Sequence, residues 1–154
     1  MVYQHFYRHT IKGRSEELKI KPIFDVHLGS PMCDVQALRG YLEDSDKNTV
    51  FICGGDLLDC IIVSDTKRYR KGGDDNEGEA IIDQQVKKMV NILMPYRERI
   101  LGVGNGNHED NITVRCGTNP SKRISEALGV PELGYSWLYR IFLDVKCKKG
   151  KLVR

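Results

Sequence analysis

The chain has 154 residues, of which 40% are hydrophobic and 29% charged, and its formal net charge is +3. These values fit a single globular domain over residues 1–154 and exclude a disordered or fibrous chain. The charge is too small to identify a nucleic-acid-binding protein by itself, although it would not repel an anionic substrate.

Cysteine usage and the amino-terminal sequence bear on the cell compartment. Five cysteines form an odd set without a Cys-x-x-Cys pair, which argues against a disulfide framework and a structural zinc site. The amino terminus lacks the apolar run of a signal peptide, and no stretch approaches the roughly 20 apolar residues that span a bilayer. We therefore expect a cytoplasmic protein without membrane contact.

Short apolar runs alternate with segments of helical period, which predicts α/β architecture. The first half predicts strands at 18–24 and 49–53, and helices at 34–43 and 82–95. The second half predicts strands at 99–103 and 135–145, a helix at 120–128 and a hairpin turn at 148–150. The polar connection 63–78 is expected to form a surface loop at the rim of a site.

Three polar blocks follow the first three predicted strands. They are Asp25-Val26-His27, Gly54-Gly55-Asp56-Leu57-Leu58-Asp59 and Gly106-Asn107-His108-Glu109. Carboxylates and an imidazole suit Mn²⁺, Fe or Zn²⁺ better than Ca²⁺, and Asn107 adds a carbonyl oxygen. A carboxylate such as Asp56 can bridge two ions roughly 3.5–4 Å apart, an arrangement that suits phosphoester hydrolysis.

In these blocks the sequence resembles the calcineurin-like metallophosphoesterase superfamily, whose pattern is D-x-H, G-D-x-x-D, G-N-H-[DE], a lone histidine and then G-H-x-H. The resemblance covers residues 18–110. It implies the N-terminal half of an α/β/β/α sandwich with a mixed sheet and flanking helices. It also implies that Asp25 and His27 bind one metal, Asp56 bridges, Asn107 binds the second metal, His108 protonates the leaving oxygen, and Asp59 hydrogen-bonds His108.

The chain departs from the family pattern after the third block. No histidine follows His108, whereas the pattern requires three more histidine ligands. The complete enzyme would hold two divalent ions, but this chain would hold at most one of them well. We therefore expect an N-terminal part of a longer enzyme, whose missing half or a partner chain supplies the histidines, with an unpaired sheet edge and an uncovered sheet face.

The substrate is less well defined than the reaction. The first block is similar to that of DNA-repair exonucleases and phage-type phosphoesterases, and Arg68 and Arg70 lie in a basic segment that could contact a nucleic-acid backbone. We expect a phosphodiesterase or nuclease-like enzyme that acts through a hydroxide activated by two metals. A protein or nucleotide phosphatase and a non-catalytic, protein-binding scaffold are the alternatives.

The segment Gly102-Val103-Gly104-Asn105-Gly106 resembles a dinucleotide-binding loop. However, the third glycine of that motif would fall on Asn107, and no helical pattern follows directly. We therefore predict neither a dinucleotide site nor a helix at this point.

Overall fold

The computed structural model describes residues 3–11, 16–62, 65, 67, 81–146 and 152–153. The elements in chain order are β1 Tyr3–Ile11, β2 Lys19–Phe24, α1 Val35–Glu43, β3 Thr49–Gly55, α2 Ile81–Leu93, the 3₁₀ helix η1 Met94–Arg99, β4 Ile100–Gly104, α3 Asn107–Cys116, α4 Pro120–Leu128, β5 Glu132–Gly134, β6 Trp137–Lys146 and β7 Leu152–Val153.

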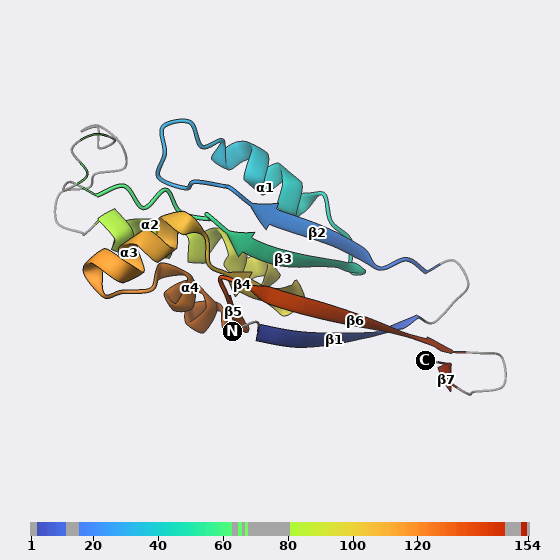
Figure 1. The fold of residues 1–154 in the computed structure, drawn as a ribbon. Coiled ribbons are helices and arrows are strands. Elements are labelled where there is room, and N and C mark those ends of the chain that lie inside the picture. Colours follow the sequence, from blue (N-terminus) through green and yellow to red (C-terminus); the bar gives the residue numbers. More distant parts are fainter. Residues whose placement is uncertain are drawn as a thin grey trace.

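A four-stranded parallel sheet with the order β2-β3-β4-β5 carries the three polar blocks (Figure 1). Strands β3 and β4 are buried along their whole length, as expected for central parallel strands covered on both faces. Strand β2 lies at the edge, where Pro22 costs no ladder hydrogen bond. Because all four strands are parallel, their carboxyl ends meet at one edge of the sheet.

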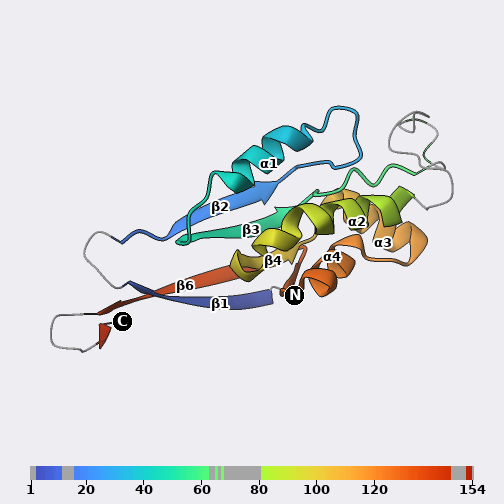
Figure 2. The same cartoon turned by 180° about the vertical axis from the view of Figure 1, so that it is seen from behind.

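The helices pack their apolar stripes onto this sheet. Leu38 and Leu42 of α1 and Met89 of α2 belong to one buried cluster, together with Phe51 of β3 and Ile124 of α4. Figure 2 shows α2 lying across β3 and β4. Aligned apolar residues every three or four positions explain why these segments form helices that cover a sheet.

A second sheet has the order β1-β6-β7, with β1 and β6 parallel and β6 and β7 antiparallel. It forms a long ribbon beside β4 (Figures 1 and 2). The Tyr139 hydroxyl donates to the Leu101 carbonyl at 3.0 Å, and this bond ties the ribbon to the parallel sheet. On the ribbon, Phe6 is 59% exposed and Phe142 is 42% exposed.

The predicted α/β class is confirmed, with parallel strands in sheets flanked by helices. Four elements had no counterpart among the sequence predictions, and two of them are the short strand β5 and the 3₁₀ helix η1. Helix α3 begins at Asn107, directly after the glycine-rich segment where no helix was predicted. The segment Tyr3–Ile11, for which no strand was predicted, is β1. The predicted turn at 148–150 lies outside the described residues, as does most of the connection 63–78.

No helix within the described parts of the chain is both long enough and apolar enough to cross a membrane. Among the cysteines that the structure describes, Cys53, Cys60 and Cys116 are free thiols.

Candidate metal centre

The segments after β2 and β3 run side by side beyond the regular strands and present the first two blocks. Their main chains exchange hydrogen bonds in register: Asp25 N to Gly55 O at 3.2 Å, His27 N to Asp56 O at 3.0 Å, Leu28 N to Leu57 O at 2.9 Å and Asp59 N to Leu28 O at 3.0 Å. The side chains of Leu28, Leu57 and Leu58 are fully buried. These leucines anchor the segments, so the polar residues between them are held at the edge of the sheet.

The backbone in these segments is strained at Cys60 and at three residues that the sequence predicts as metal ligands. Asp25, His27 and Asp56 have φ of 51°, 50° and 49°, and Cys60 has φ of 54°. A left-handed backbone at a residue other than glycine costs of order 1 kcal/mol or more, and it persists only where the surroundings impose it. The strain is therefore concentrated at three of the four predicted metal ligands.

Two histidines and a carboxylate meet at the carboxyl edge of the sheet. One ligand atom from each of His27, Asp59 and His108 lies within 4.8 Å of the others, and this is the one such group among the residues that the structure describes. The ring centroids of His27 and His108 are 4.4 Å apart and the rings meet edge to face. His27 Nδ1 is 3.6 Å from Asp59 Oδ1, which is longer than a hydrogen bond but close enough for electrostatic attraction.

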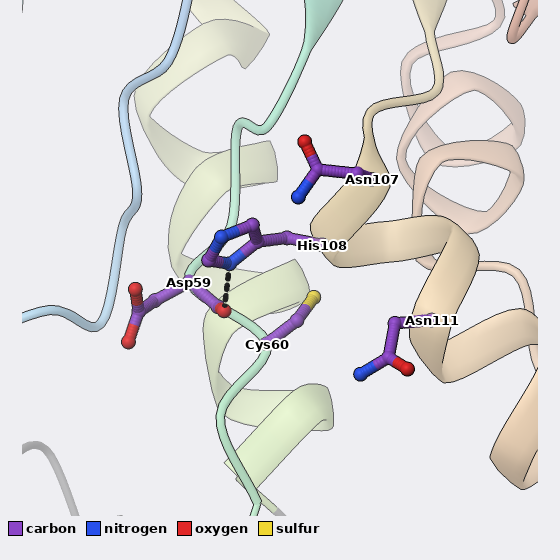
Figure 3. A pocket seen from close by; sticks show the side chains of 5 residues that line it. All are labelled: Asp59, Cys60, Asn107, His108 and Asn111. Atoms are coloured by element: carbon purple, nitrogen blue, oxygen red, sulfur yellow. Dashed lines mark hydrogen bonds between the residues drawn. The ribbon is translucent and has the colours of Figure 1, made fainter. Parts of the chain in front are cut away.

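The hydrogen bond that orients His108 comes from the main chain. His108 Nδ1 lies 2.5 Å from the carbonyl oxygen of Asp59, whereas the sequence predicted a bond to the Asp59 carboxylate (Figure 3). A carbonyl oxygen can only accept, so Nδ1 carries the proton in this contact. Asp59 therefore faces both imidazoles, with its carboxylate toward His27 and its carbonyl toward His108.

The carboxylates of Asp56 and Glu109 each accept hydrogen bonds from the main chain of the segment that carries the other residue. Asp56 Oδ1 accepts from the main-chain N–H of His108 at 2.8 Å. In return, the Glu109 carboxylate accepts three main-chain bonds, from Asp56 at 3.0 Å, Leu58 at 2.9 Å and Gly106 at 3.1 Å. Glu109 is fully buried, and this burial raises the pKa of its carboxyl while the main-chain donors oppose the shift.

The two segments approach each other so closely that side chains would not fit between their backbones. A Cβ at Gly106 would lie 2.2 Å from the nitrogen of Asp56, and one at Gly55 would lie 2.6 Å from the nitrogen of Gly106. Gly55 also has φ of 151°, which L residues rarely adopt. Gly55 and Gly106 are therefore required by this backbone contact.

A pocket of about 250 Å³ opens beside His108. It is lined by Asp59 and Cys60 from the segment after β3, and by Asn107, His108 and Asn111 from α3 (Figure 3). Asn107 and Asn111 are one helical turn apart, so their amides lie on the same side of α3. Burial raises the pKa of the Cys60 thiol, and the neighbouring carboxylates of Glu109 and Asp59 raise it further.

The structure brings together only part of the predicted site. His27, Asp59 and His108 form the group described above, and Asn107 lines the same pocket. Asp56 contacts α3 directly, and Asp25 is exposed at the end of β2. Arg68 and Arg70, the predicted substrate contacts, lie outside the described residues.

Four residues of this region had no role in the sequence predictions: Cys60, Gln85, Glu109 and Asn111. Two of them had a signal in the sequence. Glu109 stands three positions after Gly106, the spacing at which an acidic side chain caps a helix. Gln85 interrupts the apolar stripe of α2, where a polar residue needs a buried partner.

No known protein family, curated protein or solved structure matches this chain. The resemblance to metallophosphoesterases therefore remains a prediction from the three sequence blocks.

Proposed function

We propose that this chain carries part of the active site of a metal-dependent phosphoester hydrolase that acts on phosphodiesters. The observation that supports the proposal is the convergence of the three blocks at the carboxyl ends of β2, β3 and β4. Ligand sites of open parallel sheets lie at this edge. The backbone strain at Asp25, His27 and Asp56 also favours a functional origin, because such strain collects at active sites.

The donor set fits a divalent transition metal. Such ions bind carboxylates and imidazoles at roughly 2.0–2.2 Å. His27, one of the predicted ligands, belongs to the group of His27, Asp59 and His108 whose ligand atoms lie within 4.8 Å of one another. Asp25, His27 and Asp56 would hold one ion and Asn107 would contribute to a second. Bound ions would supply Lewis acidity toward a phosphoryl group and would neutralise its charge.

The residues of the chain itself have separable roles in this proposal. Asp59 faces the Nδ1 atoms of both imidazoles and hydrogen-bonds that of His108, so that Nε2 of His27 would serve an ion and Nε2 of His108 would serve the substrate. From this position His108 would donate a proton to the leaving oxygen. The amides of Asn107 and Asn111 line the same pocket and can donate to phosphate oxygens.

The first test is a calorimetric titration of the 154-residue chain with Mn²⁺. We expect binding of about one ion, lost in His27→Ala and retained in His9→Ala, a histidine of β1 away from the site. Hydrolysis of bis(p-nitrophenyl) phosphate in Mn²⁺ would then be compared between the wild type and His108→Ala. The variant should bind Mn²⁺ like the wild type and lose turnover by about 10²-fold or more. Equal turnover in the two proteins would refute the role of His108.

One observation favours a non-catalytic scaffold as the alternative. Asp56 caps the first turn of α3, and Glu109 accepts from three main-chain N–H groups, so these two acidic residues have a structural use without any metal. A scaffold of this kind would fold without binding Mn²⁺. A folded wild-type chain that takes up no Mn²⁺ and hydrolyses no phosphodiester would therefore favour the scaffold over the enzyme.

A further inference from the structure

Gln85 is a polar residue on the buried face of α2. It is only 5% exposed and lies in the stripe that includes Ile82, Val86 and Met89. A buried amide without a partner destabilises a protein, so Gln85 requires a specific contact at this position.

The Gln85 amide lies between the two segments that carry the first and second blocks. Its Oε1 accepts from the main-chain N–H of Cys60 at 3.0 Å, in a buried hydrogen bond. Its Nε2 lies against Gly29, where an added Cβ would be only 2.1 Å away. Gln85 therefore contacts both segments without belonging to any of the three blocks.

The same peptide group that binds Gln85 also binds His108. The N–H of the Asp59–Cys60 peptide donates to Gln85, and its carbonyl accepts from His108 Nδ1 at 2.5 Å. A peptide group is planar, so a contact that fixes its N–H also fixes the direction of its carbonyl. Cys60 adopts a left-handed backbone, with φ of 54°, which requires such a constraint.

We propose that Gln85 is a positioning residue for His108, acting through the Asp59–Cys60 peptide group. Its hydrogen bond holds the peptide in the orientation that fixes the His108 proton on Nδ1 and leaves Nε2 without a proton. The effect on the histidine does not depend on any metal or substrate. Only its catalytic consequence rests on the proposed phosphoester hydrolase function.

The direct test is the tautomer of His108, measured by long-range ¹H–¹⁵N correlation on the apo chain. We expect the Nδ1–H form in the wild type and in Gln36→Met, a control at an exposed glutamine of α1. Gln85→Met removes the acceptor at similar side-chain length and should shift His108 toward a mixture of tautomers. Gln85→Glu restores an acceptor oxygen and should restore the Nδ1–H form. A folded Gln85→Met variant with unchanged tautomer would overturn the proposal.

A second measurement needs no variant and remains decisive if Gln85→Met does not fold. The hydrogen bond to Gln85 should protect the Cys60 amide from hydrogen exchange in the wild type. Rapid exchange of this amide in the folded wild-type chain would contradict the proposal.

Measurements of turnover distinguish the proposed role of Gln85 from the proposed hydrolase function. If the chain hydrolyses a phosphodiester, Gln85→Met should lower kcat by about tenfold with KM unchanged, because a mispositioned proton donor affects the transition state more than substrate binding. An unchanged kcat in an active chain would contradict the catalytic part. Absence of activity in every protein, with the tautomer shift present, would contradict only the proposed function.

Discussion

The main-chain N–H of Asp56 donates to the Glu109 carboxylate at 3.0 Å, and this bond joins the end of β3 to the first turn of α3. The Asp56 carboxylate returns the contact by accepting from the main chain of His108. Each carboxylate thus satisfies donors on the other segment. The residues that would bind metal and the residues that would act on substrate are therefore parts of one hydrogen-bonded unit, ordered before any ligand is bound.

Removal of the Glu109 side chain should destabilise the whole chain. In Glu109→Ala three main-chain N–H groups, one buried and two part-buried, lose their acceptor, and we expect a loss of roughly 3–5 kcal/mol in the free energy of unfolding. Asp110→Asn, which changes the charge of an exposed neighbour, should cost less than about 1 kcal/mol. Urea denaturation of both variants measures the difference. Equal midpoints would show that the Glu109 bonds contribute nothing to stability.

Most strands and the apolar helices could be predicted because their patterns are local in sequence. Helix α1 begins at its Asp34 cap, as predicted, and the apolar period of α2 places Met89 and Leu93 in the core. Helix α3 lacks this period, with Ile112 as its one buried apolar residue. Its first turn is stabilised by Glu109 and by Asp56, which comes from a strand far away in sequence. The apolar period therefore could not predict this helix, and its local signal was the spacing of Gly106 and Glu109.

The site was predictable in composition but only partly in geometry. The three blocks predicted that their polar side chains lie at one sheet edge, because parallel strands end at one edge, and the structure groups His27, Asp59 and His108 there. They could not predict that His108 would bind the carbonyl of Asp59 instead of its carboxylate, since that choice depends on the left-handed backbone at Cys60. The strand β1 escaped prediction for a similar reason, because its partner β6 lies at the other end of the chain.

Asp59→Asn tests the carboxylate that faces His27. The substitution keeps the main-chain carbonyl that binds His108, so it affects only the contact with His27. Under the proposed metal site, we expect the affinity for Mn²⁺ to fall by about 10- to 100-fold, as for other carboxylates that orient a ligating histidine. Calorimetry measures the affinity, with Glu126→Gln on the exposed face of α4 as the control. Equal affinities in the two variants would contradict this role for Asp59.

The loop before β3 should respond to acid. A hydrogen bond from Lys19, with a second from Thr49, holds the pKa of Asp46 at about 2, below its ordinary 3.8. Because the folded pKa is the lower one, the ionised carboxylate stabilises the fold above about pH 4, and this contribution is lost as the pH falls through about 2.

Asp46→Asn should therefore lower the urea midpoint at neutral pH. Between about pH 4 and pH 2 the urea midpoint of the variant should decrease by less than that of the wild type. The effect should be small and weakened by salt, because Asp46 and Lys19 are exposed. Asp44→Asn, at a neighbouring exposed carboxylate, serves as the control. An acid transition that is unchanged in Asp46→Asn would show that this carboxylate does not contribute.

Gly106→Ala should separate the two segments of the site. The new Cβ would lie 2.2 Å from the nitrogen of Asp56 and 2.3 Å from its Oδ1, so the carboxylate would have to leave the N–H of His108. We expect a loss of roughly 1–3 kcal/mol in the free energy of unfolding, the usual cost of forcing extra atoms into packed structure.

In Gly40→Ala the new methyl group meets nothing within 4 Å in helix α1, so this control should gain about 0.5–1 kcal/mol from the higher helix propensity of alanine. The midpoints of thermal and of urea denaturation should both fall in Gly106→Ala and both rise in Gly40→Ala. A shift in the same direction would contradict the close contact between Gly106 and Asp56.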